Sequence, residues 1–525
     1  MKSIAAALLL SLSLPLAAAD APDLQVQTRI RQEGFRNSKV MEFASGLVDS
    51  IGPRLTGSPN LKRANEWTRK KLEDFGLSNA HLESWGPFGR GWSYDSVTVR
   101  QVVPESVQLL AIPKAWSPST QGTVRGTPVK VKLETSEDLA KNKGKLAGRI
   151  VMLGEPPEVK AHTQVEFVRL DDKALLERQQ YEVGKPRFTG EEVLKRRRWA
   201  RELARFLEEE KVAAVLDPGR GDYDTFLVQA AGSYKTDEPA GAPTVVLSSE
   251  QYGRLSRLLD RNEPVEIEVN VQTHYYPDDL NAYNTVAELP GGDKKAEVVM
   301  LGAHLDSWHA GTGATDNAAG VAATMEAIRI LKSLGVTPRR TIRIALWSGE
   351  EQGLLGSRAY VAQHFGSFPV PSDPDEASLG PTMRKTHGAV TTKPEHARLS
   401  AYFNLDNGTG KIRGIYAQEN AAVRPIFETW LEPLRDLGAT IVTMRNTGST
   451  DHIPFDEVGL PGFQFVQDDV EYTTRTHHTN ADVYERLQRD DLMQAAVVIA
   501  TFVWEAANRP ELMPRKPMPV DDTVH

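Results

Sequence analysis

Seven side chains that can bind a metal ion recur in the second half of the chain, each at or near the end of an apolar run. They are those of His304, Asp306, Asp316, Glu350, Glu351, Asp406 and His478. Open α/β sheets present ligand-binding residues at the carboxyl ends of their strands, where such runs stop. Imidazoles and carboxylates without thiolates suit zinc or another divalent transition metal. The pattern therefore indicates a metal centre at one edge of a sheet.

A hydrolytic centre with two metal ions needs one carboxylate between the ions, further protein ligands for each ion, and a free carboxylate as general base. The chain holds five candidate ligands for such a centre: His304 and Asp406 for one ion, Glu351 and His478 for the other, and Asp316 between them.

Two other carboxylates are expected to act without binding metal. Adjacent residues at a strand end point in opposite directions, so Glu350 and Glu351 divide into one base, Glu350, and one ligand. Asp306 lies two residues after His304 and can accept the second N–H of that imidazole, which fixes its tautomer. Small residues around Asp316 let the backbone approach the metals closely. The alternative, a phosphate-binding glycine-rich loop, would need a Lys-Ser/Thr ending that this segment lacks.

Length and composition predict a globular protein of more than one domain. At 525 residues the chain exceeds what one hydrophobic core normally supports. Its formal net charge of −8 argues against a nucleic-acid or anionic-membrane partner. The one basic cluster, residues 195–198, lies in a helical pattern and is expected to be a solvated helix face. The absence of cysteine excludes disulfides, thiolate ligands and cysteine-based catalysis.

The first residues, MKSIAAALLLSLSLPLAAADAP, have the pattern of a signal peptide. Lys2 supplies the positive charge, residues 4–16 the apolar stretch, and residues 17–19 the cleavage site, so 1–19 are predicted to be removed. The apolar stretch is shorter than the roughly 20 residues that span a bilayer. We therefore expect an exported protein, periplasmic or extracellular, without membrane insertion.

The pattern along the chain predicts an α/β fold with an inserted domain. Residues 20–124 form the N-terminal part of a catalytic domain that resumes at 274–508, where strands and helices alternate. This alternation implies a mixed, largely parallel sheet sandwiched by helices. Residues 125–273 are β-rich, carry none of the recurrent ligands, and are expected to be the insert. The segment 366–396 indicates an insertion or lid, and the Pro-rich 509–525 a disordered tail.

Several motifs resemble those of the zinc metallopeptidase family that includes bacterial leucyl aminopeptidase and plasma glutamate carboxypeptidase (carboxypeptidase Q-like). The motifs are GAHLDSW, GTGATDNAAG, LWSGEEQG, NLDNG and HHTNAD, together with SGLVDSIGPRLTGSPNLKRA near the start. The resemblance spans almost the whole chain after the signal peptide. It implies a zinc-exopeptidase fold, and residues 125–273 resemble the protease-associated domain inserted in several members.

The resemblance also implies residue roles. Two zinc ions would take the five ligands given above, with Glu350 as the base. His478, not His477, matches the family pattern H-T-x-x-D, which Asp482 completes, so His477 is expected to line the pocket. Asn317 stands where the family often has aspartate, at a position that is not a ligand.

The direction of cleavage is less constrained. The stretch TDHIPF resembles the aminopeptidases more than the carboxypeptidase Q-like members, which makes Asp451 and His452 candidates for the substrate side or for a structural turn. A carboxypeptidase needs an arginine to grip the substrate carboxylate in bidentate fashion. Arg445 and Arg475 are the candidates, with a surface role as the alternative.

The leading hypothesis is an exported two-zinc exopeptidase that acts on dipeptides and short peptides, carboxypeptidase Q-like, with aminopeptidase activity as the alternative. A non-catalytic binding ectodomain and an acyl-transfer enzyme on the same scaffold are further alternatives. An intact Glu350 argues against the binding ectodomain, which has no use for a base. The expected partners are peptide substrates, and a homodimer stays open.

Overall fold

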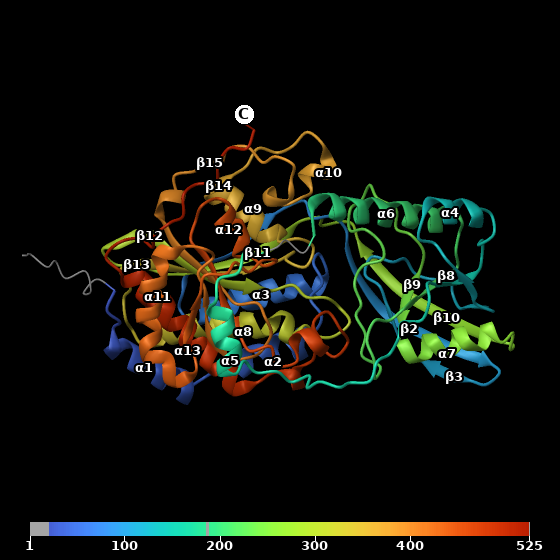
Figure 1. Ribbon diagram of the computed structural model, residues 1–525, viewed down its shortest axis with the longest axis horizontal. Helices are drawn as coiled ribbons and strands as arrows, with labels where there is room; N and C mark the ends of the chain where they lie inside the picture. Colours follow the sequence, from blue (N-terminus) through green and yellow to red (C-terminus); the bar gives the residue numbers. More distant parts are fainter. Residues whose placement is uncertain (1–19, 185–187, 524–525) are drawn as a thin grey trace, which may run out of the picture.

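The computed structural model describes residues 20–184 and 188–523 (Figure 1). The predicted signal peptide, residues 1–19, lies outside the described residues. Two bodies lie side by side: a larger one with a sheet surrounded by helices, and a smaller β-rich one around α6 (Gly190–Glu209) (Figure 1). None of the helices in the described part of the chain has the length and hydropathy needed to cross a membrane.

The larger body is built on an eight-stranded sheet. Its strands are β1 (Ser78–Trp85), β11 (Ala282–Leu289), β12 (Lys294–His304), β13 (Arg340–Trp347), β16 (Leu399–Asn404), β17 (Ile412–Tyr416), β18 (Ile441–Thr443) and β19 (Gly462–Gln467). Their order across the sheet is β1-β11-β13-β12-β16-β19-β17-β18. The central strands β13, β12, β16 and β19 run parallel. Towards one edge, β11 pairs antiparallel to β13 and to β1; towards the other, β17 pairs antiparallel to β19 and parallel to β18. The predicted mixed, largely parallel sheet is confirmed.

Helices cover both faces of this sheet, as predicted. One face packs against α1 (Leu24–Arg36), α2 (Val40–Ser45), α3 (Pro59–Asp74), α8 (Ala319–Ser333), α11 (Arg424–Leu431) and α13 (Arg489–Asn508), and the other against α9 (Leu355–His364) and α12 (Ile453–Glu457). Successive residues of a strand face opposite sides, so Val299 and Leu301 enter the first core and Met300 enters the second. Burial on both faces fixes the register of β12 and therefore the place where it ends.

The smaller body contains two further sheets. The first has the order β3-β2-β10-β5 and the second β4-β9-β8-β7-β6. Their strands are β2 (Gly91–Val103), β3 (Val107–Leu109), β4 (Ala111–Pro113), β5 (Val124–Gly126), β6 (Val129–Val131), β7 (Ile150–Leu153), β8 (Ala214–Pro218), β9 (Thr244–Leu247) and β10 (Glu266–Tyr276). Three helices belong to the same stretch: α4 (Ser136–Asn142), α6 and α7 (Ser249–Asp260). The boundaries at 125 and 273, and the identification as a protease-associated domain, stay predictions.

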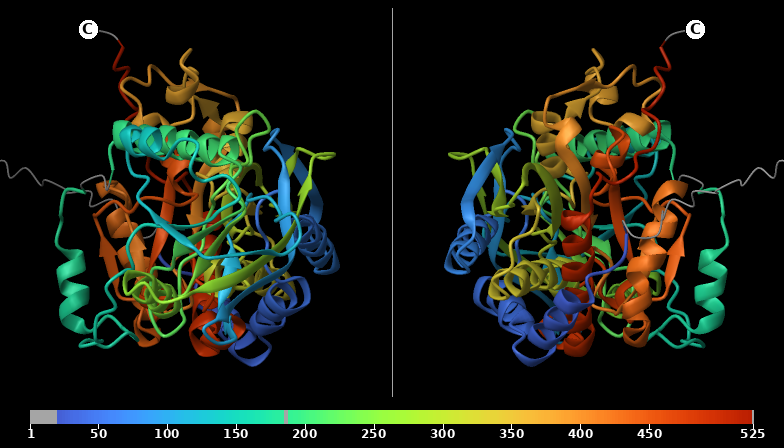
Figure 2. Two further views of the ribbon diagram at one scale, coloured as in Figure 1. Left: turned by 90° about the vertical axis from the view of Figure 1, so that its right-hand side faces the viewer. Right: turned by 90° about the vertical axis from the view of Figure 1, so that its left-hand side faces the viewer.

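The smaller body also reaches onto the larger one. Helix α5 (Asp172–Gln179) lies at the flank of the larger body, away from α4, α6 and α7 (Figures 1 and 2). Its Leu175 packs against Tyr416, Ile441 and Val466 of the large sheet. The segment between β7 and β8 therefore contributes α6 to the smaller body and α5 to the surface of the larger one.

The basic cluster on α6 has partners within the chain. The Arg198 Nε atom lies 2.7 Å from Asp375 Oδ2 of α10 (Pro374–Ala377), and Arg197 donates to the Ser378 carbonyl oxygen at 3.0 Å. All four residues of the cluster are exposed, as expected of a solvated helix face, and Arg197 and Arg198 also contact the inserted segment 366–396.

The C-terminal segment runs along the larger body. Met513 is buried, and Arg515 donates to the carbonyl oxygens of His396 and Leu399 at 2.7 and 2.9 Å. Lys516 Nζ lies 2.7 Å from Asp456 Oδ1. The Pro-rich composition predicts a disordered tail, but this segment is in contact with the larger body, because its side chains form specific hydrogen bonds and an ion pair there.

A buried arginine, Arg54, joins the N-terminal part of the chain to the loops after β12. Its guanidinium donates to the carbonyl oxygens of Leu305, Thr312 and Gly313 at 2.8, 2.9 and 2.7 Å. Burial lowers the pKa of Arg54 to about 10, so the group stays cationic at neutral pH. The loops at 305 and 312–313 flank the predicted metal centre, and Arg54 holds both.

We expect Arg54→Met to lower the free energy of unfolding by about 3–5 kcal/mol, because three buried or partly buried carbonyls would each lose a donor worth about 1–3 kcal/mol. Urea unfolding followed by tryptophan fluorescence measures the change. Arg205→Met on the exposed side of α6 is the matched control, with an expected change within about 0.5 kcal/mol. Equal unfolding midpoints for the two variants would contradict the anchoring role.

Candidate metal centre

Parallel strands ending side by side deliver three of the predicted site residues. β12 ends at His304, Glu350 follows the end of β13, and Asp406 follows the end of β16. β12 lies between β13 and β16, and His304 stands opposite Trp347 of β13. The carboxyl ends of parallel strands meet at one edge of a sheet, so these side chains gather there.

Three buried side chains form a first group that can hold a cation. His304 Nε2 lies 3.2 Å from Asp316 Oδ1 and 3.2 Å from Asp406 Oδ1. One ligand atom from each of the three residues lies within 4.8 Å of the others. Metal–ligand distances of about 2 Å fit a cation between atoms at this spacing.

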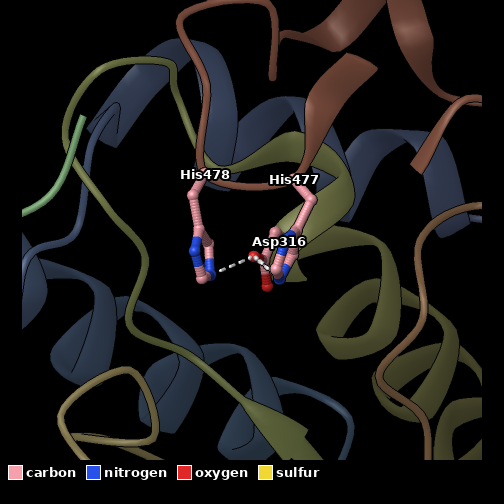
Figure 3. A group of neighbouring side chains, drawn as sticks. All are labelled: Asp316, His477 and His478. Carbon is pink, nitrogen blue, oxygen red and sulfur yellow. Dashed lines mark ion pairs between the residues drawn. The ribbon is translucent and has the colours of Figure 1, made fainter. Parts of the chain in front are cut away.

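A second group lies on the other side of Asp316. Its Oδ2 atom is 3.2 Å from His478 Nε2 and 3.9 Å from His477 Nε2, and the dashed lines in Figure 3 mark these ion pairs. The Glu351 Oε2 atom is 2.9 Å from His478 Nε2. Asp316 Oδ2 and Glu351 Oε1 are buried without a hydrogen-bond partner among the described residues, so both oxygens are available to a cation.

The two imidazoles of this group are not equivalent. His478 Nε2 is closer to Asp316 and also contacts Glu351, as the sequence pattern predicts for the ligand. His477 stacks on His478 with ring centroids 3.7 Å apart and belongs to the same metal-compatible group. His477 therefore lies close enough to Asp316 to take part in the metal-compatible group, beyond the pocket-lining role that the sequence predicts.

The turn that carries Asp316 is held from two directions. Asp482 accepts hydrogen bonds from the backbone N–H groups of Thr315 and Asp316, at 2.6 and 3.2 Å. The Asn317 side chain donates to the Leu405 carbonyl oxygen at 3.0 Å, next to Asp406. Asp482 and Asn317, which the sequence pattern places outside the ligand set, thus fix the central carboxylate relative to both groups.

The position of Asp306 differs from the expected one. His304 Nδ1 is 3.0 Å from the Asp306 carbonyl oxygen and 3.6 Å from its carboxylate. The carboxylate instead accepts from Thr56 Oγ1 at 2.9 Å and from the backbone N–H groups of Glu350 and Glu351 at 3.3 Å. Asp306 therefore fixes the imidazole through its main chain and the two glutamates through its side chain.

The pKa values of several side chains in the centre are raised above their ordinary values. Burial opposes a charged imidazolium, but the surrounding carboxylates, Asp406 foremost, raise the pKa of His304 well above its usual value. Burial opposes the charge on His478 too, yet Glu351 and Asp316 raise its pKa to about 10. Burial, with the negative charge of Asp316, raises the pKa of Glu351 to about 7. Such an excess of buried negative charge favours bound cations.

Neither glutamate belongs to the two tightest metal-compatible groups of the described residues, but the Glu351 side chain contacts His478, whereas the ion pairs around Asp316 do not include Glu350. Burial raises the pKa of Glu350 well above its ordinary value; the charge on His304 opposes this, and the carboxylates of Asp406 and Asp451 add to it. A carboxylate whose proton affinity is raised beside a metal site suits a general base.

The predicted substrate-side pair is buried. Asp451 accepts a hydrogen bond from Ser357 Oγ, and burial raises its pKa to about 7. The His452 ring lies 2.9 Å from the side-chain amide of Gln418 and 3.0 Å from the Thr447 carbonyl oxygen. Of the two interpretations of this stretch, these contacts favour the structural turn for His452.

Both arginines considered for a substrate carboxylate are already engaged. Arg445 donates to the carbonyl oxygens of Glu177 and Gln180 beside α5. Arg475 forms an ion pair with Glu166.

Sequence reasoning missed two residues that act on this centre. The family-like segment SGLVDSIGPRLTGSPNLKRA contains Arg54, so that similarity was an available signal. Gln229 has no such signal: its side-chain amide lies 3.1 Å from His478 Nδ1, across 249 residues of sequence. A small cavity opens beside Asp316 and His478, with Trp308 in its wall.

Comparison with known proteins finds similarity to one peptidase family. Residues 284–503 match the model of Peptidase family M28. Carboxypeptidase Q of Rattus norvegicus is 27% identical over 476 residues, 89% of this chain and 85% of that protein. Aminopeptidase YwaD of Bacillus subtilis is 28% identical over 226 residues, 42% of this chain and 43% of that protein. The crystal structure of a peptidase M28 precursor from Shewanella amazonensis has a TM-score of 0.63 at 22% identity, covering 95% of this chain and 99% of that one. The resemblance predicted from the motifs is confirmed.

The raised pKa of His478 predicts a proton-linked metal site. With a pKa of about 10, the metal-free imidazole carries its proton at neutral pH and must lose it to bind a cation. We expect zinc binding at neutral pH to release protons. We also expect zinc affinity to fall about tenfold for each unit by which the pH is lowered, for each proton released. Titration calorimetry in buffers of different ionisation enthalpy measures the release.

A matched pair of variants locates the released protons. His478→Gln should release fewer protons than the parent, whereas His274→Gln, which changes an imidazole on β10 paired with Asp95, should release as many. Heats of binding that do not depend on the buffer would contradict the prediction.

Proposed function

We propose that this chain, whose residues 284–503 match the model of Peptidase family M28, is an exported exopeptidase that uses two zinc ions to hydrolyse terminal peptide bonds of dipeptides and short peptides. The observation that carries the proposal is the position of Asp316, with one carboxylate oxygen beside His304 and the other beside His478. A carboxylate shared in this way is the feature that a centre with two ions requires. The signal-peptide pattern of residues 1–19 supports export.

The donor set fits zinc. It consists of imidazole nitrogens and carboxylate oxygens without thiolate, and two of its buried oxygens lack hydrogen-bond partners among the described residues. We assign the ligands as His304 and Asp406 for one ion, Glu351 and His478 for the other, and Asp316 for both. Bound zinc supplies a Lewis acid that polarises the scissile carbonyl and makes water more acidic.

The residues of the chain perform the proton transfers. Glu350 takes a proton from the attacking water and later gives it to the leaving amine, a role that its raised pKa supports. Asp306 accepts from the backbone N–H groups of Glu350 and Glu351, so the base and a ligand keep fixed relative positions. This coupling of base and ligand is a reason for the two glutamates to be adjacent.

We favour carboxypeptidase Q-like cleavage, because similarity to carboxypeptidase Q extends over 89% of this chain. Aminopeptidase cleavage is the second candidate, and a specific observation favours it: Arg445 and Arg475 are both bound to other parts of the chain and so are not available to a substrate carboxylate. A non-catalytic binding role has less support, because Glu350 and all five proposed ligands are present.

We expect Glu350→Gln to lower kcat by about 10²–10⁴-fold while two zinc ions per chain remain bound, because the change removes the base and no ligand. Elemental analysis and turnover of a dipeptide measure the two quantities. Glu351→Gln is the matched control at the adjacent position and should lose zinc. Loss of zinc from Glu350→Gln, or full activity, would show that the roles of the two glutamates are wrongly divided.

Blocked peptides decide the direction of cleavage. We expect an N-acetylated tripeptide to be shortened from its C-terminus and a C-terminally amidated tripeptide to be refused, with products identified by mass spectrometry. The opposite result, cleavage of the amidated peptide and refusal of the acetylated one, would establish aminopeptidase activity instead. The Glu350→Gln protein serves as the blank for contaminating peptidases.

A further inference from the structure

A strand-like segment of the smaller body docks against the loop that carries His478. The backbone N–H of Val228 donates to the His478 carbonyl oxygen at 3.1 Å, and Leu227 forms an antiparallel bridge with Thr479. Asn480 completes the contact, because its side chain accepts from the Phe226 N–H at 2.9 Å. These bonds join the smaller body directly to the metal centre.

Gln229 is the residue of this segment that reaches the imidazole itself. Its side-chain nitrogen Nε2 lies 3.1 Å from His478 Nδ1, in a partly buried contact. Its main chain is tied to the smaller body, because the Gln229 carbonyl oxygen accepts from the Ala115 N–H at 3.1 Å. The opposite ring nitrogen, Nε2, faces Glu351 at 2.9 Å and Asp316 at 3.2 Å. The ring is therefore held between the smaller body and the proposed ligands.

The chemistry of an imidazole ligand gives this contact a direction. A neutral histidine that binds a cation through Nε2 carries its proton on Nδ1, and that N–H needs an acceptor. A glutamine amide offers an oxygen or an NH₂ group after a half-turn, and its hydrogen-bond partner decides which one faces the ring. With a cation at His478 Nε2, a half-turn of the Gln229 amide exchanges its Nε2 for its oxygen and places an acceptor against Nδ1–H.

We propose that Gln229 is a positioning residue of the metal centre, contributed by the smaller body. Its side-chain oxygen accepts from His478 Nδ1–H, which fixes the tautomer and aims Nε2 at the ion shared with Glu351. The proposal rests on the two-zinc function proposed above. It gives the smaller body a role in the centre: affinity for one ion depends on whether segment 226–229 is docked.

The test compares Gln229→Ala, which removes the acceptor, with Gln229→Glu, which keeps an acceptor at the same distance. Gln272→Ala in β10 is the matched control, because its amide donates to Asn270 of the same strand. Each full-length protein is loaded with zinc, then titrated with a competing chelator while the zinc bound per chain is counted. Thermal unfolding of the metal-free proteins reports any general loss of stability.

We expect Gln229→Ala to weaken one of the two ions by about 10- to 100-fold, the range for loss of such a partner, and to leave the other ion unchanged. Gln229→Glu and Gln272→Ala should match the parent, and metal-free unfolding should be alike in all four proteins. Unchanged affinity in Gln229→Ala, equal weakening of both ions, or an equal loss in Gln229→Glu would overturn the proposal.

The parent protein separates this proposal from the proposed function. If the parent binds one ion only, the two-zinc function fails, and a weaker ion in Gln229→Ala together with its rescue in Gln229→Glu still supports the role of Gln229. If the parent binds no zinc, both proposals are overturned.

Discussion

The structure is organised around a concentration of negative charge that only cations can balance. Asp316 lies between His304 and His478, and the carboxylates of Glu351 and Asp406 complete the two groups around it. Removing an unpaired carboxylate from water costs several kcal/mol, and carboxylates at such distances also repel one another. The raised pKa values of both imidazoles express this imbalance within the protein. A bound dication reverses it, since it is the largest local charge.

A rigid frame is needed to keep these like charges together. The parallel centre of the sheet ends β12, β13 and β16 at one edge, with cores on both faces that fix their register. The loops beyond these strands are less constrained, and buried polar side chains hold them. Arg54 binds the carbonyls of 305, 312 and 313, Asp482 binds the turn of Asp316, and Asp306 binds the backbone of both glutamates.

The larger body does not complete the centre by itself. His478 lies in a loop, eleven residues after the end of β19, and has a positive φ of 62°. Its position is therefore not fixed by a strand of the sheet. Segment 226–229 of the smaller body pairs with this loop, and α5 and α6 add contacts at the flank and at segment 366–396. The two bodies therefore share the site, although the residues that meet there lie far apart in the sequence.

The sequence alone determined which residue types end the strands, because the alternation of apolar runs and the groups that follow them are local features. It therefore predicted the layered α/β fold and the side chains that the structure gathers around Asp316. It misassigned the carboxylate of Asp306, it did not indicate that α6 contacts segment 366–396, and it gave no sign of Gln229. Each of these depends on a partner that packing brings close from far along the chain, 249 residues away for Gln229 and His478. Only the tertiary structure decides such contacts, because no local periodicity encodes which distant surfaces meet.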